Sequence, residues 1–398
     1  MDITIQPGLL QGDVSIIPSK SQAHRLLICA AFADGPTTLT CPQTNEDIQA
    51  TAACLNALGA KIQRTDDGYQ VYPVSALPEK AELPCGESGS TLRFLLPVVG
   101  ALGVDALFHM QSRLPQRPLS PLWEEMERMG CQLSRPTADT LRCTGKLNSG
   151  TYNIDGSISS QYVSGLLFAA ALLPGDSEIM IHGTLESAPY VDMTRQALQQ
   201  FGCITNGYRI CGNQQLHSPG SIHVEGDWSN GAFFLAANAL GSRVSIHGLN
   251  LQSYQGDRLI TEILPKMDRF TTISAANIPD LIPVLAVTAA AKAGAVFTEI
   301  RRLRLKESDR VASVIAMLRA LDIHAEATEN TFTVHPGVFR PGKVDTANDH
   351  RIAMSAAIAA TIATGPVTIL GCQCVNKSFP SFWEEYARLG GQYEQYIR

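Results

Sequence analysis

The chain of 398 residues is 45% hydrophobic and only 17% charged, with a formal net charge of −6. Its length predicts two or three domains with large buried cores, and its composition is typical of a globular protein. The negative charge excludes a general attraction to nucleic acid or to anionic membranes. A bound anion would therefore have to be met by a local cluster of cations.

The ten cysteines are scattered singly, without the spacing of a zinc site. Free thiols of this kind are typical of a reducing compartment. The first residues, MDITIQPGLLQGDVSI, lack the basic and apolar regions of a signal peptide, and the apolar runs of the chain are too short and too rich in alanine to span a bilayer. We therefore expect a cytoplasmic protein.

An internal repeat organises the chain. In each copy a cluster of small polar residues precedes a helix rich in Ala and Leu, and a glycine turn and a strand follow. The six segments with this pattern span residues 19–39, 88–107, 159–181, 229–246, 279–300 and 349–370. Each leads to a second, amphipathic helical segment, at residues 46–62, 118–133, 190–204, 256–270, 308–323 and 379–393.

The ends of the second segments predict where their helices stop. Four of them end in Leu, Met or Phe followed by Gly, which is typical of a helix C-terminus. Alternating segments, such as 68–74 and 330–336, then predict strands. A complete copy is therefore a β-α-β-α-β-β unit.

The spacing of the copies predicts the fold. They begin near residues 20, 88, 159, 229, 280 and 349, so the successive spacings are 68, 71, 70, 51 and 69 residues. The fourth copy is short by about 20 residues, and we expect it to lack its final strand pair. Uniformly apolar helices belong inside and sheets outside. Six such units predict a two-domain, inside-out α/β barrel-like fold with pseudo-threefold domains and a shortened fourth repeat.

Domain boundaries follow from the same repeat. Residues 18–226 would form an N-terminal domain of three repeats. Residues 1–17 together with 227–398 would form a C-terminal domain of three repeats, one of them shortened. The chain would cross between the domains near residues 13–20 and 224–230.

Unusual polar residues gather at one point of the repeat, at the starts of the first helices. Lys20, Ser21 and Arg25 lie at such a start in PSKSQAHR, and GESGSTLRF at 86–94 offers a glycine turn. Backbone N–H groups, hydroxyls and cations at a helix N-terminus favour a bound anion. Ser21, and the serines of SISSQYVSG at 157–165, are equally well interpreted as helix caps.

The second half carries a denser group of charges. RLRLKESDR at 302–310 places six charged side chains in nine positions, directly before a helix with an apolar face. The ordinary interpretation is a solvated helix start that is capped at Ser308 or nearby. By the same reasoning Asp280, in NIPDLIP, would cap the Ala-rich buried helix that directly follows it. His350 and Arg351 open the last repeat, where a single histidine is more often structural than catalytic.

Together these motifs resemble the EPSP synthase family. The segments PSKSQAHR, GESGSTLRF, PQRPL, SISSQ, SAPYVDMT, VEGDWSN, QGD, IPDLIP, RLKESDR, NDHRIAM and KSFPSFW occur in the family's order, and the match runs from about residue 5 to 385. The resemblance implies transfer of the enolpyruvyl group of phosphoenolpyruvate (PEP) to the 5-hydroxyl of shikimate 3-phosphate, a step of aromatic amino-acid synthesis, without a metal or organic cofactor. Both substrates are polyanions, which would explain the charges at 302–310.

The resemblance also assigns residues to the substrates. Shikimate 3-phosphate would be bound by Lys20, Ser21, Arg25, Ser159, Ser160, Ser187, Asp280 and Lys306. PEP would be bound by Lys20, Gly89, Arg117, Arg310, Arg351 and Lys377, with Gln161 between the two substrates. Asp280 would accept the hydroxyl proton and Glu307 would protonate the methylene carbon of PEP, and Lys20 and Lys377 complete the catalytic set. Because both predicted domains contribute, we expect a monomer that closes on its substrates.

Two positions depart from the family. Arg302 stands where many members have Asn, and Glu87 replaces a usual Asn in the glycine turn. One alternative is the sister family that transfers enolpyruvyl to UDP-N-acetylglucosamine, but its reactive cysteine falls at Ser112 here. A nucleic-acid-end enzyme or RNA-binding protein built from similar repeats is disfavoured by the net charge. A non-catalytic anion-binding protein is disfavoured by the complete catalytic set.

Overall fold

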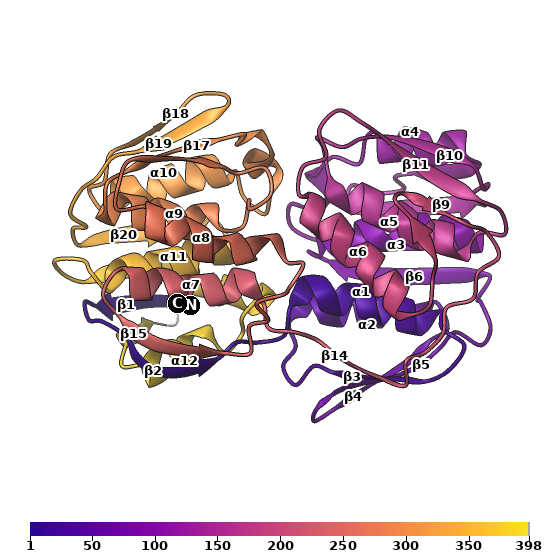
Figure 1. Cartoon of the computed structure of the whole chain (residues 1–398), viewed down its shortest axis with the longest axis horizontal. Coiled ribbons are helices and arrows are strands. Elements are labelled where there is room, and N and C mark those ends of the chain that lie inside the picture. Colours follow the sequence, from indigo (N-terminus) through magenta and orange to yellow (C-terminus); the bar gives the residue numbers. More distant parts are fainter. Residues whose placement is uncertain (397–398) are drawn as a thin grey trace. The chain divides into compact units, whose positions relative to one another are not determined.

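The computed structural model describes residues 1–396, which divide into two units (Figure 1). Unit 1 comprises Met1–Ile17 and the chain from Gly226 onward, and unit 2 comprises Pro18–Glu225. Each unit buries its own apolar core. Within each unit, helices occupy the interior and sheets lie around them, as the apolar character of the first helices predicted.

Unit 2 contains three four-stranded sheets, in the orders β14-β3-β5-β4, β6-β7-β9-β8 and β10-β11-β13-β12. Its strands are β3 (Thr37–Thr40), β4 (Lys61–Thr65), β5 (Gly68–Tyr72), β6 (Lys80–Gly86), β7 (Asp105–Met110), β8 (Cys131–Ser134), β9 (Thr140–Gly145), β10 (Thr151–Asp155), β11 (Ser177–His182), β12 (Thr205–Asn206), β13 (Arg209–Ile210) and β14 (Ser221–His223). Its helices are α1 (Lys20–Ala31), α2 (Glu46–Ala57), α3 (Gly89–Leu102), η1 (Leu114–Gln116), α4 (Leu122–Arg128), α5 (Ser160–Leu172) and α6 (Ala188–Gln200).

Unit 1 contains two four-stranded sheets, β16-β17-β19-β18 and β20-β21-β1-β22, and a two-stranded sheet, β15-β2. Its strands are β1 (Asp2–Gln6), β2 (Gln11–Ser15), β15 (Arg243–His247), β16 (Thr271–Ser274), β17 (Ala295–Thr298), β18 (Ala325–Ala327), β19 (Thr331–Val334), β20 (Gly342–Asp345), β21 (Val367–Leu370) and β22 (Gln392–Tyr396). Its helices are α7 (Trp228–Ala239), η2 (Gly256–Leu259), α8 (Ile260–Ile263), η3 (Leu264–Lys266), α9 (Ile282–Ala291), η4 (Arg301–Leu305), α10 (Arg310–Ala320), α11 (His350–Ala360), η5 (Cys372–Lys377) and α12 (Phe382–Arg388).

Each four-stranded sheet repeats one topology. In four of these sheets the strands on either side of a first helix pair in parallel, as in β6-β7 and β16-β17, and two antiparallel strands complete the sheet. In the sheet β14-β3-β5-β4 the parallel partner of β3 is β14, which precedes α7 and not α1. In the last sheet β1 takes a hairpin position, because it pairs antiparallel with both β21 and β22. The four predicted terminal glycines, Gly59, Gly130, Gly202 and Gly390, all have positive φ and confirm the predicted helix ends.

The shortened fourth repeat is confirmed. After β15 the chain forms the broken segment η2-α8-η3, and the next strand, β16, already belongs to the following sheet. The outer edge of β15 is satisfied at Val244 by a side chain instead of a strand. Asn238 donates its amide to the Val244 carbonyl at 2.8 Å and accepts from the Val244 N–H at 2.7 Å.

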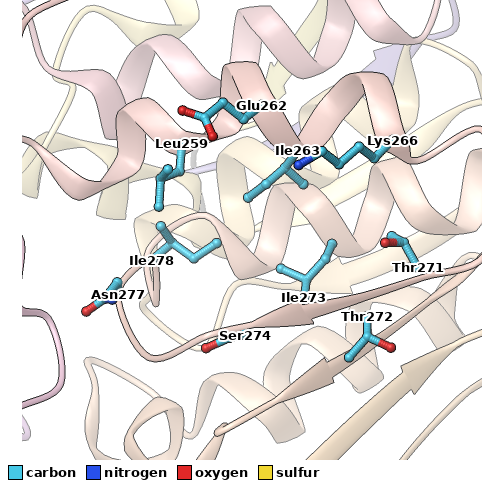
Figure 2. A pocket seen from close by; sticks show the side chains of 10 residues that line it. All are labelled: Leu259, Glu262, Ile263, Lys266, Thr271, Thr272, Ile273, Ser274, Asn277 and Ile278. Carbon is cyan, nitrogen blue, oxygen red and sulfur yellow. The ribbon is translucent and has the colours of Figure 1, made fainter. Parts of the chain in front are cut away.

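A pocket of about 290 Å³ lies beside this broken segment. Figure 2 shows apolar side chains of Leu259, Ile263, Ile273 and Ile278 lining it, with Lys266 among the polar residues around it. The pocket is lined by α8, its neighbouring turns and β16, all within unit 1. Among the described residues, no helix is long and apolar enough to cross a membrane.

Close packing of α3 against α5 generates a prediction about stability. A Cβ on Gly165 would lie 2.2 Å from the carbonyl oxygen of Arg93. We expect Gly165→Ala to push the helices apart and to lower the thermal midpoint by at least about 3 °C, measured by circular dichroism. The matched control is Gly8→Ala, because a methyl group there meets nothing within 4 Å. Equal midpoints for the two variants would contradict the prediction.

Candidate active site

In unit 1 one buried guanidinium joins three carboxylates. Arg310, at the start of α10, donates from Nε to Asp349 Oδ2 (2.9 Å), from Nη1 to Asp280 Oδ1 (2.5 Å) and from Nη2 to Glu307 Oε2 (2.7 Å). Burial alone would lower the pKa of Arg310, but the charges of Asp349, Glu307 and Asp280 raise it well above its usual value. Arg310 is therefore a permanent cation that orients both proposed catalytic carboxylates.

Two further cations approach Asp280. Lys306 Nζ lies 3.7 Å from Oδ1, and Arg351 Nη2 donates to Oδ2 at 3.5 Å. Burial by itself would raise the pKa of Asp280, but Lys306, Arg310 and Arg351 hold it well below its usual range. Burial lowers the pKa of Lys306 to about 8, against the attraction of Asp280. At neutral pH, Asp280 is therefore ionised and Lys306 still carries its proton.

The cap expected at Asp280 is wrong, whereas the cap expected at Ser308 or nearby is confirmed at the neighbouring Asp309. Helix α9 follows Leu281 with no side-chain cap, so Asp280 is not its N-cap. Helix α10 is capped by Asp309, which accepts from the Ala312 N–H at 3.1 Å, whereas Ser308 donates to Asp349 at 3.0 Å. The segment 302–310 is thus not a solvated helix start, because its last arginine is buried among carboxylates.

Arg351 is the strongest sign of an anionic ligand. Its guanidinium is buried in α11, 5.9 Å from the ring centre of Phe233. Nε and Nη1 are shielded from solvent and have no hydrogen-bond partner among the described residues. Leaving a buried donor unsatisfied is costly, so these atoms favour a bound carboxylate or phosphate. Lys377, also buried, ends η5 and donates to the Asn348 carbonyl at 3.1 Å.

Asp257 and Asp349 are polar residues of this centre that the sequence analysis missed. Asp257 is fully buried and accepts a hydrogen bond from Ser229. Burial, and then the nearby charge of Asp280, raise the pKa of Asp257 to about 7. Asp349 caps α11 by accepting from the Arg351 N–H at 2.9 Å. The segments QGD and NDHRIAM carried these residues, but sequence alone did not bring them near Asp280.

In unit 2 two guanidiniums converge on Gly89 at the start of α3. A Cβ at Gly89 would lie 2.7 Å from Nη1 of both Arg93 and Arg117. Only glycine therefore allows both cations to approach this helix N-terminus, which itself favours an anion. Arg93 was not among the predicted residues. Its position four residues after Gly89, one helical turn away, was the signal that could have found it.

Gln161 extends the same cluster. Its Oε1 accepts from Arg93 Nη1 at 3.3 Å, and its Nε2 donates to Ser90 Oγ at 2.9 Å. Helix α5 is capped by Ser159, which accepts from the Gln161 N–H at 3.3 Å, so the cap interpretation is confirmed for this serine. The α3 and α5 helix starts are therefore linked through side chains that the sequence placed 71 residues apart.

The start of α1 holds a second pair of cations. Its cap is Ser19, not Ser21, and Lys20 Nζ lies 2.8 Å from Asp47 Oδ2. Arg25 is buried, and it donates to the Ser21 carbonyl at 2.5 Å. Burial lowers the pKa of Arg25 to about 9, so it remains a cation at neutral pH. The centre of its guanidinium lies 4.9 Å from the ring centre of Phe94 on α3.

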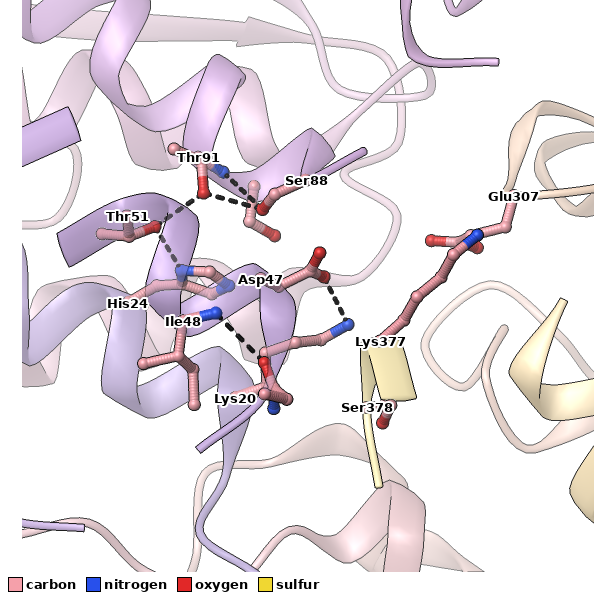
Figure 3. A network of polar contacts seen from close by, with 12 residues as sticks. Lys20, His24, Asp47, Ile48, Thr51, Ser88, Thr91, Glu307, Lys377 and Ser378 are labelled. Atoms are coloured by element: carbon pink, nitrogen blue, oxygen red, sulfur yellow. Dashed lines mark hydrogen bonds and ion pairs between the residues drawn. The ribbon is translucent and has the colours of Figure 1, made fainter. Parts of the chain in front are cut away.

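A buried chain of hydrogen bonds fixes α1, α2 and α3 relative to one another. Figure 3 shows His24 Nδ1 paired with Thr51 at 2.7 Å, Thr51 with Thr91 at 2.6 Å, and Thr91 donating to Ser88 at 2.7 Å. Burial lowers the pKa of His24 well below its usual value, so the ring is neutral. The chain positions the helix starts that carry Lys20 and Gly89.

Ser160 and Ser187 lie at the starts of α5 and α6. Ser160 is the first residue of α5 and is buried. Ser187 directly precedes α6 and is also buried. Its φ of 56° places it in the left-handed region, which is rare outside glycine and often associated with function.

The two departures from the family pattern have visible contacts. Glu87 accepts a hydrogen bond from Ser112, whose φ is 51°. This bond joins the glycine turn to the loop in which the sister family carries its cysteine. Arg302, in η4, acts on the site through charge, because it contributes to the lowered pKa of Lys306.

The predicted residues are divided between the two units. Unit 2 contains Lys20, Ser21, Arg25, Gly89, Arg117, Ser159, Ser160, Gln161 and Ser187, and unit 1 contains Asp280, Lys306, Glu307, Arg310, Arg351 and Lys377. The chain is an inside-out α/β protein, with helices inside and sheets outside. The cations at its helix starts favour the binding of anions. The roles that the family resemblance assigns to these residues remain predictions.

Comparison with known proteins identifies the family. The family EPSP synthase (3-phosphoshikimate 1-carboxyvinyltransferase) matches residues 5–277 and 269–386. The 3-phosphoshikimate 1-carboxyvinyltransferase of Clostridium beijerinckii is 36% identical over 431 aligned residues, covering 99% of both chains. That of Clostridium perfringens is 38% identical over 420, covering 98% of both. The chain belongs to the EPSP synthase family.

Solved structures agree on the fold. An EPSP synthase from Acinetobacter baumannii superposes with a TM-score of 0.81 at 24% identity, over 99% of this chain and 100% of the other. The enolpyruvyl transferase NikO from Streptomyces tendae gives a TM-score of 0.75 at 19% identity, over 99% and 98%. At these identities the similarity establishes the inside-out α/β fold.

The raised pKa of Asp257 makes stability depend on pH. The folded chain keeps this proton up to about pH 7, whereas the unfolded chain loses it near the ordinary value of 3.8. The contribution of Asp257 to stability is therefore largest at low pH and decreases as the pH rises toward 7. Asp257→Asn mimics the protonated form and does not titrate. Between about pH 5 and about pH 8 we expect its thermal midpoint to fall less than that of the wild type. Parallel pH profiles would contradict this assignment.

Proposed function

We propose that the protein transfers the enolpyruvyl group of PEP to the 5-hydroxyl of shikimate 3-phosphate and releases phosphate. The observation that carries the proposal is that Asp280 and Glu307 are both held by the guanidinium of Arg310, at 2.5 and 2.7 Å. An acid and a base are thus fixed on one cation, beside the unsatisfied donors of Arg351. Family membership supplies the substrates.

The reaction is an addition followed by an elimination. In the addition, the 5-hydroxyl oxygen bonds to C2 of PEP, Asp280 accepts the hydroxyl proton, and Glu307 donates a proton to the methylene carbon C3. In the elimination, the Glu307 carboxylate takes a proton back from the new methyl group and the C2–O bond to phosphate breaks, which restores the double bond. The proton held by Asp280 passes to the departing phosphate. Lys20, Lys377 and the arginines stabilise the negative charge on the departing phosphate.

The electrostatics of unit 1 couple substrate binding to the basicity of Asp280. Three cations depress the pKa of Asp280, which makes it a weak base. Anionic PEP would compete for Arg351 and Arg310, and each withdrawn cation raises the pKa of Asp280. The base is therefore strengthened when PEP is bound.

Unit 2 would hold the anionic groups of the substrates. Gly89, with Arg93 and Arg117 beside it, combines a helix N-terminus with two guanidiniums, which suits PEP. The hydroxyls at the starts of α5 and α6 would bind the phosphate of shikimate 3-phosphate. The left-handed backbone of Ser187 gives that side chain a direction that a helical residue would not have.

The proposal includes a cytoplasmic monomer. All ten cysteines are free, and only Cys211 is exposed, which supports a reducing compartment. The exposed large apolar residues of the described chain, such as Leu9, Ile204 and Leu251, are scattered in sequence. Light scattering at several concentrations would reveal a dimer.

A phosphate-release assay tests the function. Phosphate should appear from PEP only when shikimate 3-phosphate is present, and mass spectrometry should find the enolpyruvyl ether. UDP-N-acetylglucosamine in place of shikimate 3-phosphate tests the sister activity, which the serine at position 112 disfavours. Phosphate release with UDP-N-acetylglucosamine but not with shikimate 3-phosphate would overturn the proposal. So would an absence of phosphate release with either acceptor.

Replacing either catalytic carboxylate should slow turnover much more than binding. We expect Asp280→Asn and Glu307→Gln to lower kcat by about 10² or more, the scale of losing a positioned acid or base. Asp268→Asn is the matched control, because this exposed carboxylate pairs with Lys292 in the same unit. A variant that keeps more than half of the wild-type kcat removes that residue from the catalytic set.

Substrate binding should also change the size of the molecule in solution. The proposed contacts of one substrate pair come from both units, so saturation with shikimate 3-phosphate should reduce the radius of gyration measured by small-angle scattering. Shikimate, which lacks the phosphate, is the control and should have a smaller effect at equal concentration. An unchanged radius at saturation would mean that no closure accompanies binding.

A further inference from the structure

Three side chains of kinds that can bind a metal lie together on the β18-β19 hairpin, and none of them is among the proposed site residues. Glu326 pairs with Thr333, and the N–H of His335 donates to the carbonyl of His324 at 3.0 Å. Alternate residues of a strand share one face, so His324, Glu326 and His335 are neighbours on one face of the hairpin. On the other face Val334 and Ala325 are buried in the core of unit 1, which anchors the hairpin.

Distances between the side chains fit ligands of one ion. One ligand atom from each of the three residues lies within 4.8 Å of the other two. His335 Nε2 and Glu326 Oε1 are 3.7 Å apart, which is too far for a hydrogen bond. Two tetrahedral ligands of an ion with bonds of about 2.1 Å would be separated by about 3.4 Å. A small rotation of either side chain therefore reaches coordination distance.

His335 offers a second observation. Its Nε2 atom is shielded from solvent and has no hydrogen-bond partner among the described residues. The two imidazole rings are stacked, with centres 4.8 Å apart and an angle of 25° between their planes. The stack holds both rings beside Glu326, so a metal would need little reorganisation of the site. A bound cation would also satisfy the exposed Glu326 carboxylate and the shielded nitrogen together.

We propose that His324, Glu326 and His335 form a binding site for a divalent transition metal, of which Zn²⁺ fits best. Two imidazoles and one carboxylate suit Zn²⁺ better than Mg²⁺ or Ca²⁺, which prefer oxygen ligands alone. Water would complete the tetrahedron. The site shares no residue with the proposed substrate contacts. Its ion would link β18, the edge strand of its sheet, to β19 and so stabilise the hairpin.

Zinc titration of the full chain tests the proposal. All proteins carry Cys211→Ser, because Cys211 is the exposed thiol of the chain and would bind zinc itself. Isothermal titration with ZnCl₂ should give one ion per chain with a Kd below about 10 µM. His324→Ala and His335→Ala should each raise Kd by at least about tenfold, and Glu326→Gln should raise it less. Zinc should also raise the thermal midpoint, and the histidine variants should lose this rise.

The matched control is His109→Ala. His109 also pairs with a glutamate across neighbouring strands, Glu82, and both side chains are exposed. Among the described residues, His109 and Glu82 do not belong to a group of three possible metal ligands. The substitution should therefore leave zinc binding unchanged. Metal-free midpoints of all variants show whether each one folds. A Kd above about 10 µM for the Cys211→Ser protein, or equal binding in this protein and in both histidine variants, would overturn the proposal.

Discussion

The contact between Arg310 and three carboxylates is the interaction on which the charged centre of unit 1 depends. Asp280 and Glu307 come from the fifth repeat and Asp349 from the start of the sixth, and without a shared cation these carboxylates would repel one another in a poorly solvated place. Because Arg310 is itself buried, its charge needs these partners as much as they need it. Through this one side chain, segments distant in sequence are joined by ion pairs.

Such an arrangement has a catalytic meaning. A carboxylate surrounded by cations is reliably ionised but is a poor proton acceptor, and this describes Asp280. Asp257 is the opposite case, since burial favours its protonated form. Two carboxylic acids that influence each other therefore differ widely in proton affinity, because Asp280 lies among three cations, whereas burial dominates at Asp257. Anionic substrates act on Asp280 by competing for its cations. Substrate binding is thereby linked to the basicity of Asp280.

The repeat, the helix ends and the missing strand pair could be predicted because each leaves a local signal: spacing, a terminal glycine, or a lack of residues. The resemblance similarly identified the residues around Asp280, because family motifs carry them. Arg93, Asp257 and Asp349 were not predicted, since their roles arise from contacts across the fold. Caps were the weakest predictions. Ser19 and Asp309 each lie within two residues of the expected position, and only the backbone geometry decides which neighbour accepts the N–H.

The side chain of Asn238, which pairs with both backbone groups of Val244, shows how the fold tolerates a lost hairpin. One amide reproduces the hydrogen bonds that a neighbouring strand would supply at that residue, so the edge of β15 needs no replacement backbone there. A repeat can thus lack its outer strand pair while its first helix, here α7, stays buried. The outer strand pair of this repeat is therefore not needed to keep its first helix in the core. The edge of β15 is a site at which a strand pair could be added by design.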